Sequence, residues 1–202
     1  MPGDAAVVVG IEDYTHIAAV PYATRDAAAF HDALIYTVGI PPARVRLMDR
    51  GASAEAIRQA VAEVADLVRV GGTLWVYFAG HGAASTRTGE RLLLGQDVRA
   101  DPGAFEERAV AVAELRDLAT RGGGRAVLVL DACYTGKDRA GRELVEGGRF
   151  AVPVYAPVQE TSVVEWMTAG PNEVAGHLEL TRAQRAAVAG AEPGDCPDCP
   201  WR

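Results

Sequence analysis

The chain of 202 residues contains no run of apolar residues long enough to cross a membrane. A membrane-spanning helix needs about 20 consecutive, mostly apolar residues, and polar or charged residues interrupt every apolar segment well before that length. Residues 1–10 also lack the basic start and the long apolar stretch that are typical of a secretory signal. We therefore expect a cytoplasmic protein that does not bind membranes.

Clusters of positive charge are missing as well. The chain has 20 Lys and Arg residues against 27 Asp and Glu residues, which gives a formal net charge of −7. Nucleic acids and anionic lipid surfaces attract proteins that carry concentrated positive charge. We therefore expect no nucleic-acid partner, and a cationic partner fits this composition better.

Cysteine is scarce, with three residues in the whole chain. An odd number cannot form a closed disulfide framework, and Cys133 lies far along the chain from Cys196 and Cys199, so we expect reduced thiols. The last two form a single CxxC pair without a second pair or a histidine cluster, which is half of a zinc site. Two interpretations of this pair stay open: a tail without function, or an intermolecular zinc or disulfide link.

The residues that are present indicate one α/β domain. Hydrophobic residues make up 49% of the chain and charged residues 23%, as in ordinary globular domains. Short apolar runs predict buried strands at 5–11, 44–48, 73–79 and 126–130, with a short hairpin arm at 92–94. Helical spacing predicts helices over 24–38, from 53 to the glycines at 71–72, and over 112–120. This alternation predicts a mainly parallel central sheet with helices on both faces.

Polar clusters follow three of these predicted strands, at 22–27, 80–82 and 131–136. In open α/β sheets the functional crevice lies at the carboxyl ends of the strands, so His81 and Cys133 should meet there. A thiolate can attack a carbonyl while an imidazole moves the proton, and the N–H groups of Gly82 and Cys133 could form an oxyanion hole. Alone, each residue would be an ordinary polar loop residue or a small hydrophobe, but together they favour catalysis.

Both motifs resemble those of caspase-like cysteine peptidases of the C14 type, especially bacterial metacaspases and orthocaspases. Residues 78–82 read Phe-Ala-Gly-His-Gly, residues 131–136 read Asp-Ala-Cys-Tyr-Thr-Gly, and their separation of 133 − 81 = 52 residues is close to the roughly 50 residues noted for caspases. The resemblance covers residues 5–136, including the opening around Tyr14 and the turn at 25–27, and resumes at 163–176. It implies a caspase-hemoglobinase fold.

The resemblance also implies an activity and a specificity. It makes Cys133 the nucleophile in hydrolysis of a protein or peptide substrate, and His81 the group that protonates the leaving amine. The family's acidic pocket for arginine or lysine matches Asp26 and Asp131, whose carboxylates suit a guanidinium. The alternatives are a first-turn helix acid for Asp26 and a turn acid for Asp131. Cleavage after aspartate would require an arginine in the pocket, and Arg25 is out of register.

By the same resemblance, residues 1–136 correspond to the large-subunit portion, 137–161 to a flexible linker loop, and 162–202 to a small-subunit portion. That last portion looks shortened after residue 176, so an activating or completing protein partner is possible. The linker region is a frequent processing site in the family, and self-cleavage is a hypothesis for four basic residues there: Lys137, Arg139, Arg142 and Arg149. The alternative is a solvated basic loop.

Several departures and alternatives stay open. Ala23 and Ala79 replace a cysteine and a serine that are frequent in metacaspases, which predicts a wider or less polar pocket. Calcium, which many metacaspases need, is a possible cofactor, but its candidate ligands form no recognisable calcium loop: Asp97, Asp101, Glu106 and Glu107. The favoured function is an endopeptidase of a bacterial stress, cell-death or defence module. The alternatives are a non-catalytic caspase-like interaction domain and a CHAT-type peptidase.

Overall fold

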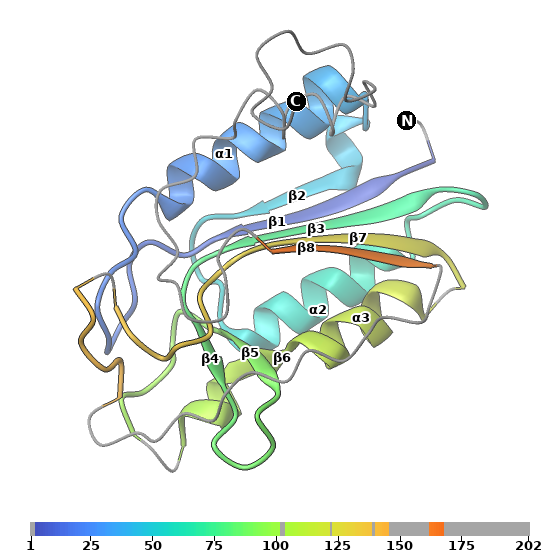
Figure 1. The fold of residues 1–202 in the computed structure, drawn as a ribbon. Helices are drawn as coiled ribbons and strands as arrows, with labels where there is room; N and C mark the ends of the chain where they lie inside the picture. Colours follow the sequence, from blue (N-terminus) through green and yellow to red (C-terminus); the bar gives the residue numbers. More distant parts are fainter. Residues whose placement is uncertain (1–2, 102–103, 122, 139, 146–161, 168–202) are drawn as a thin grey trace, which may run out of the picture.

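A five-stranded parallel sheet forms the centre of the protein, as seen in the computed structural model (Figure 1). The structure describes residues 3–101, 104–121, 123–138, 140–145 and 162–167. The strand order is β2 (Val45–Met48), β1 (Ala5–Gly10), β3 (Thr73–Ala79), β7 (Arg125–Asp131) and β8 (Val163–Met167). Every neighbouring pair is parallel. The predicted α/β domain with a mainly parallel central sheet is confirmed.

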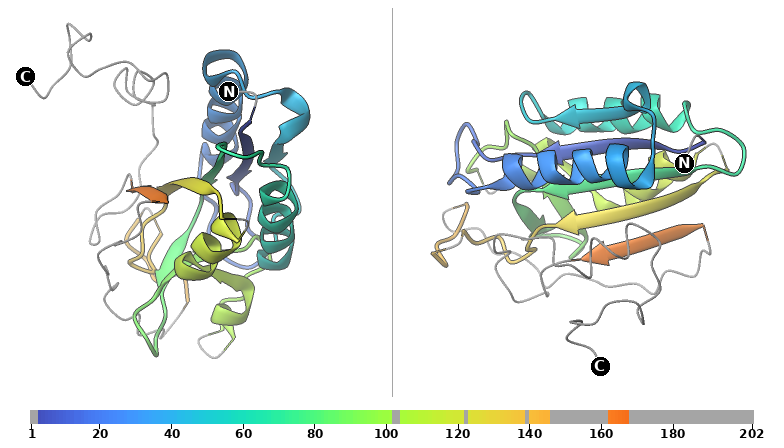
Figure 2. Two further views of the ribbon diagram at one scale, coloured as in Figure 1. Left: turned by 90° about the vertical axis from the view of Figure 1, so that its right-hand side faces the viewer. Right: turned by 90° about the horizontal axis from the view of Figure 1, so that it is seen from above.

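Helices cover both faces of this sheet. Helix α1 (Ala23–Ala33) lies on one face, and α2 (Ala54–Ala65) and α3 (Val112–Thr120) lie together on the other (Figures 1 and 2). Successive residues of β1 point to opposite faces. Val8 therefore packs in the cluster beneath α1, while Val7 packs in the cluster with α2 and α3. This two-sided burial explains why the strands read as continuous apolar runs.

Two predicted helices differ from the structure at their ends. The α-helical part of α1 ends at Ala33, and Leu34–Val38 form a π-helical turn that Gly39 closes with a positive φ of 81°. Helix α2 begins after Ser53, whose hydroxyl accepts a hydrogen bond from the Ala56 N–H. It ends at Ala65 rather than near 70, because the next N–H groups bond to carbonyls three residues back and tighten the last turn.

A second, smaller sheet packs beside the first. It is antiparallel, with the order β4 (Gly82–Ala84), β5 (Arg91–Leu94) and β6 (Ala109–Ala111). The predicted hairpin arm is β5, but its two partners have three residues each, too few for a periodic signal. Short 3₁₀ turns at Pro42–Arg44 and Phe105–Arg108 precede β2 and β6.

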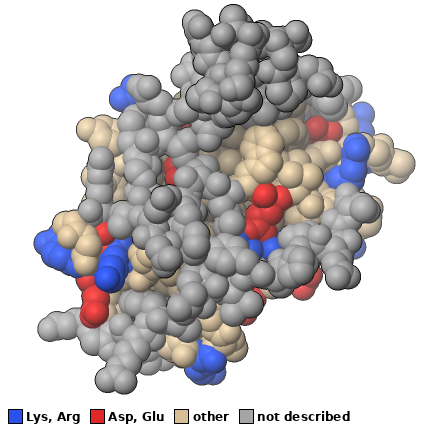
Figure 3. Space-filling view, in the orientation of Figure 1, with Lys and Arg blue, Asp and Glu red and all other residues tan. Residues whose placement is uncertain are grey.

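Some predictions fall on residues outside the described part of the chain. These are the shortened end of the small-subunit portion, Arg139 and Arg149, and the Cys196 and Cys199 pair. Within the described residues, no helix is both long and apolar enough to span a membrane. On the face shown in Figure 3, the blue and red side chains of these residues form several small groups, some with both signs next to each other, and neither sign gathers into a large patch.

Candidate active site

The pairing of β3 with β7 brings the two sequence motifs together. Ala79 at the end of β3 is in register with Asp131 at the end of β7, and the N–H of Gly80 donates a hydrogen bond to the Asp131 carbonyl at 3.2 Å. His81 and Cys133 therefore both leave the sheet at its carboxyl edge, two residues beyond paired positions. The structure places the two residues as the sequence predicted, and their chemical roles stay predictions.

His81 is buried, with 4% of its surface exposed. Its Nε2 lies 2.9 Å from the carbonyl oxygen of Ala18. Because a carbonyl can only accept, Nε2 carries the proton in this contact, and Nδ1 of the neutral ring is left as the basic atom. Burial lowers the pKa of His81 below its ordinary value of 6.5, although the Ala18 carbonyl and the negative charge of Asp138 act in the opposite direction.

Cys133 is equally buried, with 3% of its surface exposed. Its thiol donates a weak hydrogen bond to the carbonyl of Lys137, with Sγ and O 3.7 Å apart, and Thr135 donates its hydroxyl hydrogen to Sγ over 3.8 Å. A Cβ added to Gly82 would lie 2.4 Å from the Cys133 carbonyl oxygen. Only glycine allows this approach, which brings the two predicted oxyanion-hole residues together.

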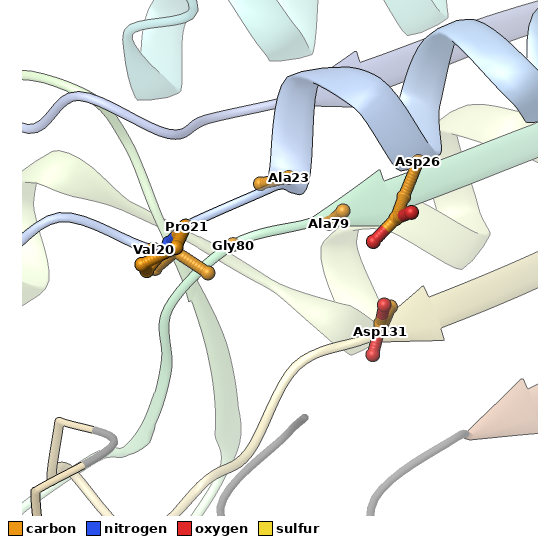
Figure 4. Close-up of a pocket in the computed structure, with 7 residues that line it drawn as sticks. All are labelled: Val20, Pro21, Ala23, Asp26, Ala79, Gly80 and Asp131. Carbon is orange, nitrogen blue, oxygen red and sulfur yellow. The ribbon is translucent and has the colours of Figure 1, made fainter. Parts of the chain in front are cut away.

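A pocket beside these residues contains both predicted specificity residues (Figure 4). The carboxylates of Asp26, from the first turn of α1, and Asp131, from the end of β7, point toward each other across it. The two side chains are mostly buried, with 8% and 6% exposure. The pocket has an empty volume of about 230 Å³, part of it open to solvent, and its lining is Val20, Pro21, Ala23, Asp26, Ala79, Gly80 and Asp131.

The two carboxylates also act together on a third group. The phenol of Tyr77 is buried beneath α1, and burial raises its pKa above the ordinary value, with further increases from the negative charges of Asp131 and Asp26. Both carboxylates therefore lie close enough to influence one hydroxyl. Ala23 and Ala79, the two departures from the metacaspase pattern, both line the pocket with small apolar side chains.

Of the predicted linker loop at 137–161, the structure describes residues 137–138 and 140–145, and these form a compact turn. Asp138 accepts hydrogen bonds from the N–H groups of Ala140 and Arg142 and from the Arg142 guanidinium. The backbones of Lys137 and Glu143 form an isolated antiparallel β-bridge. Leu144 and Val145 then enter an apolar cluster with residues of β4 and β5. Of the four predicted self-cleavage residues, Lys137 and Arg142 thus belong to a turn that also accepts the thiol hydrogen bond.

The predicted calcium ligands do not gather. Asp97 pairs with Arg108, and Glu106 accepts hydrogen bonds from Ser85 and Thr86 and pairs with Arg87. Within the described residues, no three acidic, histidine or cysteine side chains are grouped so that they could hold a metal ion. The carboxylates of Asp97 and Glu106 therefore serve local hydrogen bonds and ion pairs.

Two contacts of His81 were not predicted from the sequence. Ala18 acts through its backbone carbonyl, which every residue possesses, so no residue type could mark it. Tyr14, part of the recognised opening, accepts a hydrogen bond from the His81 N–H at 2.8 Å. Burial raises the pKa of the Tyr14 phenol, the hydrogen bond from His81 partly offsets this, and the charge of Cys133 raises it further. Tyr14 therefore lies close to both predicted catalytic residues.

Comparison with known proteins identifies the family. A family model for the caspase domain matches residues 4–186. Protein GSU0716 from Geobacter sulfurreducens shares the fold with 17% identity and a TM-score of 0.53, over 65% of this chain and 51% of that one. Caspase-1 from Spodoptera frugiperda shares it with 15% identity and a TM-score of 0.55, over 88% of this chain and 64% of that one.

The match therefore spans less than two thirds of each of these solved chains. A search of curated proteins found no match. Because the caspase domain accounts for nearly all of the sequence, including both motifs and the described strands, the chain belongs to the caspase domain family.

Proposed function

We propose that the protein is a cysteine endopeptidase of the metacaspase type that cleaves peptide bonds after arginine or lysine. One observation carries this proposal: a buried thiol and an oriented imidazole lie at adjacent strand ends, beside a pocket that contains two carboxylates. Membership of the caspase domain family supports the peptidase class.

The proposed chemistry uses both residues in two steps. Nδ1 of His81 accepts the thiol proton, and Sγ of Cys133 attacks the substrate carbonyl, so that a C–S bond forms. The N–H groups of Gly82 and Cys133 donate to the oxyanion. The imidazolium then gives its proton to the amine nitrogen as the C–N bond breaks. Water hydrolyses the resulting thioester and restores the thiol.

The charge of the pocket suits a positively charged side chain of the substrate. Two negatively charged carboxylates that face each other in a mostly buried site repel each other. A guanidinium between them would relieve this repulsion and could donate to both, because its planar group presents several N–H bonds. An ammonium would supply the same charge with less directed geometry. We therefore expect arginine to be preferred over lysine.

The test compares four peptide substrates that differ only at the residue before the scissile bond: arginine, lysine, citrulline and aspartate. Citrulline keeps the shape of arginine without its charge. We expect kcat/KM for arginine to exceed that for citrulline by roughly 10- to 100-fold, the usual contribution of charged hydrogen bonds. The Cys133→Ala variant should be inactive. Assays with and without added calcium report on the possible cofactor.

A matched pair of variants tests the pocket. Asp26→Asn should reduce the preference for arginine over citrulline, because one of the two facing carboxylates loses its charge. Asp32→Asn changes the same helix at an exposed side chain and should leave the preference unchanged. Equal cleavage after arginine and citrulline, or cleavage after aspartate, would refute the role of the pocket.

A second candidate is a caspase-like interaction domain without turnover. The burial of both His81 and Cys133 favours it, since neither group is accessible to a polypeptide as it stands. Failure of the folded full-length chain to cleave any of the four peptides would support this alternative.

Self-cleavage would convert the form with a buried thiol into an active peptidase. Lys137 and Arg142 lie in the turn that packs against the thiol, so a cut beside either residue would release the carbonyl that holds Sγ. We propose that cleavage there, or at Arg139 or Arg149, accompanies activation. Intact-mass measurement of an active preparation tests this, and an active protein that contains only uncut chain would refute it.

A further inference from the structure

We propose that Tyr14 is a positioning residue, whose hydroxyl holds the backbone of His81 and whose ring supports the imidazole. This inference deepens the proposed function and rests on it, because positioning matters only if His81 takes part in catalysis. Tyr14 lies in the segment between β1 and α1, residues 11–22, which also contains Ala18.

The hydroxyl of Tyr14 completes a hydrogen-bonded frame around His81. It accepts the His81 N–H at 2.8 Å and donates to the Leu94 carbonyl at 3.3 Å. The N–H of the same Leu94 donates to the His81 carbonyl at 3.0 Å. Both main-chain polar groups of His81 are therefore tied to one residue at the end of β5, one directly and the other through the phenol.

The need for this bridge follows from the path of the chain. β3 ends at Ala79 and β4 begins at Gly82, so His81 lies in the turn between a parallel and an antiparallel sheet. Its N–H is buried and is satisfied by the phenol oxygen, and a buried N–H without an acceptor is costly. The Tyr14 hydroxyl therefore accepts the hydrogen bond that a carbonyl of a neighbouring strand accepts within a sheet.

The ring of Tyr14 supports the side chain of the same histidine. The two ring centroids are 4.9 Å apart, and the ring planes are tilted by 47°. A Cβ added to Gly80 would lie 2.6 Å from the phenol oxygen, so the glycine before His81 leaves the space that the hydroxyl occupies. The effect of the Cys133 charge on the pKa of Tyr14 agrees with a place between the two motifs.

One segment thus holds His81 at three points. The Ala18 carbonyl holds Nε2, the Tyr14 ring contacts the imidazole, and the Tyr14 hydroxyl holds the main chain. The segment is itself fixed from outside the motifs, because the N–H of Thr15 donates to the Gln96 carbonyl and the Gln96 amide donates to the Asp13 carbonyl. A change at the hydroxyl should therefore act locally on His81.

The variant Tyr14→Phe removes the hydroxyl and keeps the ring. We expect kcat for the arginine peptide to fall about 10-fold or more, as the loss of a buried hydrogen bond at the reacting group predicts. KM should stay within about twofold, because Tyr14 does not line the Asp26 and Asp131 pocket. Ile57→Val is the control: it trims a buried side chain of α2 in the apolar cluster against which Tyr14 packs, it alters no hydrogen bond of His81, and it should leave kcat unchanged.

A second measurement does not depend on turnover. The titration of His81 can be followed by NMR, with its signal assigned among the four histidines by a His81→Gln sample. The other groups that act on this imidazole are the Ala18 carbonyl and the Asp138 carboxylate, and neither is altered by the variant. We expect Tyr14→Phe to move the titration midpoint up toward the ordinary value, because a loosened imidazole gains water. The Ile57→Val control should not move it.

The outcomes separate the two proposals. Unchanged kcat and an unchanged His81 titration in a folded Tyr14→Phe protein would overturn the role of Tyr14 while leaving the peptidase intact. An inactive wild-type protein would contradict the proposed function. In that case a shifted His81 titration in the variant would still support Tyr14 as the residue that holds the histidine.

Discussion

A buried charge network in the structure leads to a strong stability prediction for Glu165→Gln. Glu165 lies in β8, the last strand in the order of the described sheet, and pairs with Arg91 of β5 and Arg116 of α3. The side chains of Glu165 and Arg91 are only 7% and 6% exposed, and that of Arg116 is 20% exposed. The Arg91 guanidinium also lies over the ring of Tyr134, 5.6 Å from its centroid, directly after Cys133 in the chain. The network therefore joins three elements to the segment that contains Cys133, the proposed nucleophile.

The expected loss of stability depends on how deeply the two arginines that contact Glu165 are buried. Breaking a buried ion pair by removing one member typically costs about 3–5 kcal/mol. Arg116 can turn toward water, whereas the more deeply buried Arg91 cannot. Glutamine keeps an oxygen acceptor, so we expect a loss at the lower end of this range, ~3 kcal/mol in the free energy of unfolding. For a domain of this size that corresponds to a fall in Tm of roughly 6–12 °C.

Chemical denaturation followed by circular dichroism measures this loss. The control is Glu63→Gln, the same chemical change in the exposed ion pair with Arg46, where we expect a far smaller effect. Adding Arg91→Met to Glu165→Gln should recover part of the lost stability, because it removes the buried positive charge that the Glu165 carboxylate balanced. Equal stability of the two single variants, or a further loss in the double variant, would refute this account of the network.

The pH dependence gives a second check on the same residue. Burial by itself would raise the pKa of Glu165, but the hydrogen bonds and charges of Arg91 and Arg116 outweigh it and hold the pKa below the ordinary value of 4.5. A carboxylate with a lowered pKa stabilises the fold above its ordinary pKa, and this contribution is lost as the pH falls through the folded-state pKa. The difference between wild type and Glu165→Gln should therefore be full at pH 7 and shrink below about pH 4.5.

Two further predictions concern the site. Gly82→Ala would place a Cβ 2.4 Å from the Cys133 carbonyl oxygen, so we expect loss of peptidase activity and a lower Tm. A Cβ at Gly124 would lie 3.9 Å from its nearest neighbour, the Val68 side chain, so Gly124→Ala should be tolerated in both assays. Because burial lowers the pKa of His81, the unfolded chain binds this proton more readily than the folded one. The free energy of unfolding should thus fall as the pH drops below 6.5, and a His81→Gln variant should show less of this fall in denaturation curves.

Much of the fold was predictable because burial on both faces leaves a strong sequence signal. β3 and β7 are seven-residue strands with apolar runs, and the predicted ranges 73–79 and 126–130 match them within a residue. The end of α1 was not predictable in detail, since apolar residues at Leu34 and Val38 fit an α-helix and a π-helical turn alike. Strands β4 and β6 are too short to carry any period.

The candidate site was likewise predictable only in part. His81, Cys133, Asp26 and Asp131 were found because their residue types stand at strand ends or in a recognised turn. Their surroundings depend on contacts between distant segments. Glu165, for example, is a single charge in an otherwise apolar strand, and nothing in the local sequence indicates that Arg91 and Arg116 neutralise it from two other elements.

The segment between β1 and α1 gives the clearest reason why motifs alone underdetermine this site. Val20 and Pro21 line the pocket, while Ala18, two residues earlier, holds the imidazole. The Val20 N–H donates to the Glu12 carbonyl at 2.9 Å, which closes the segment on itself. A substitution that shifts this backbone should therefore change substrate binding and proton transfer together. Loss of the Tyr14 hydroxyl should change proton transfer alone, and this contrast between KM and kcat separates the segment's two roles.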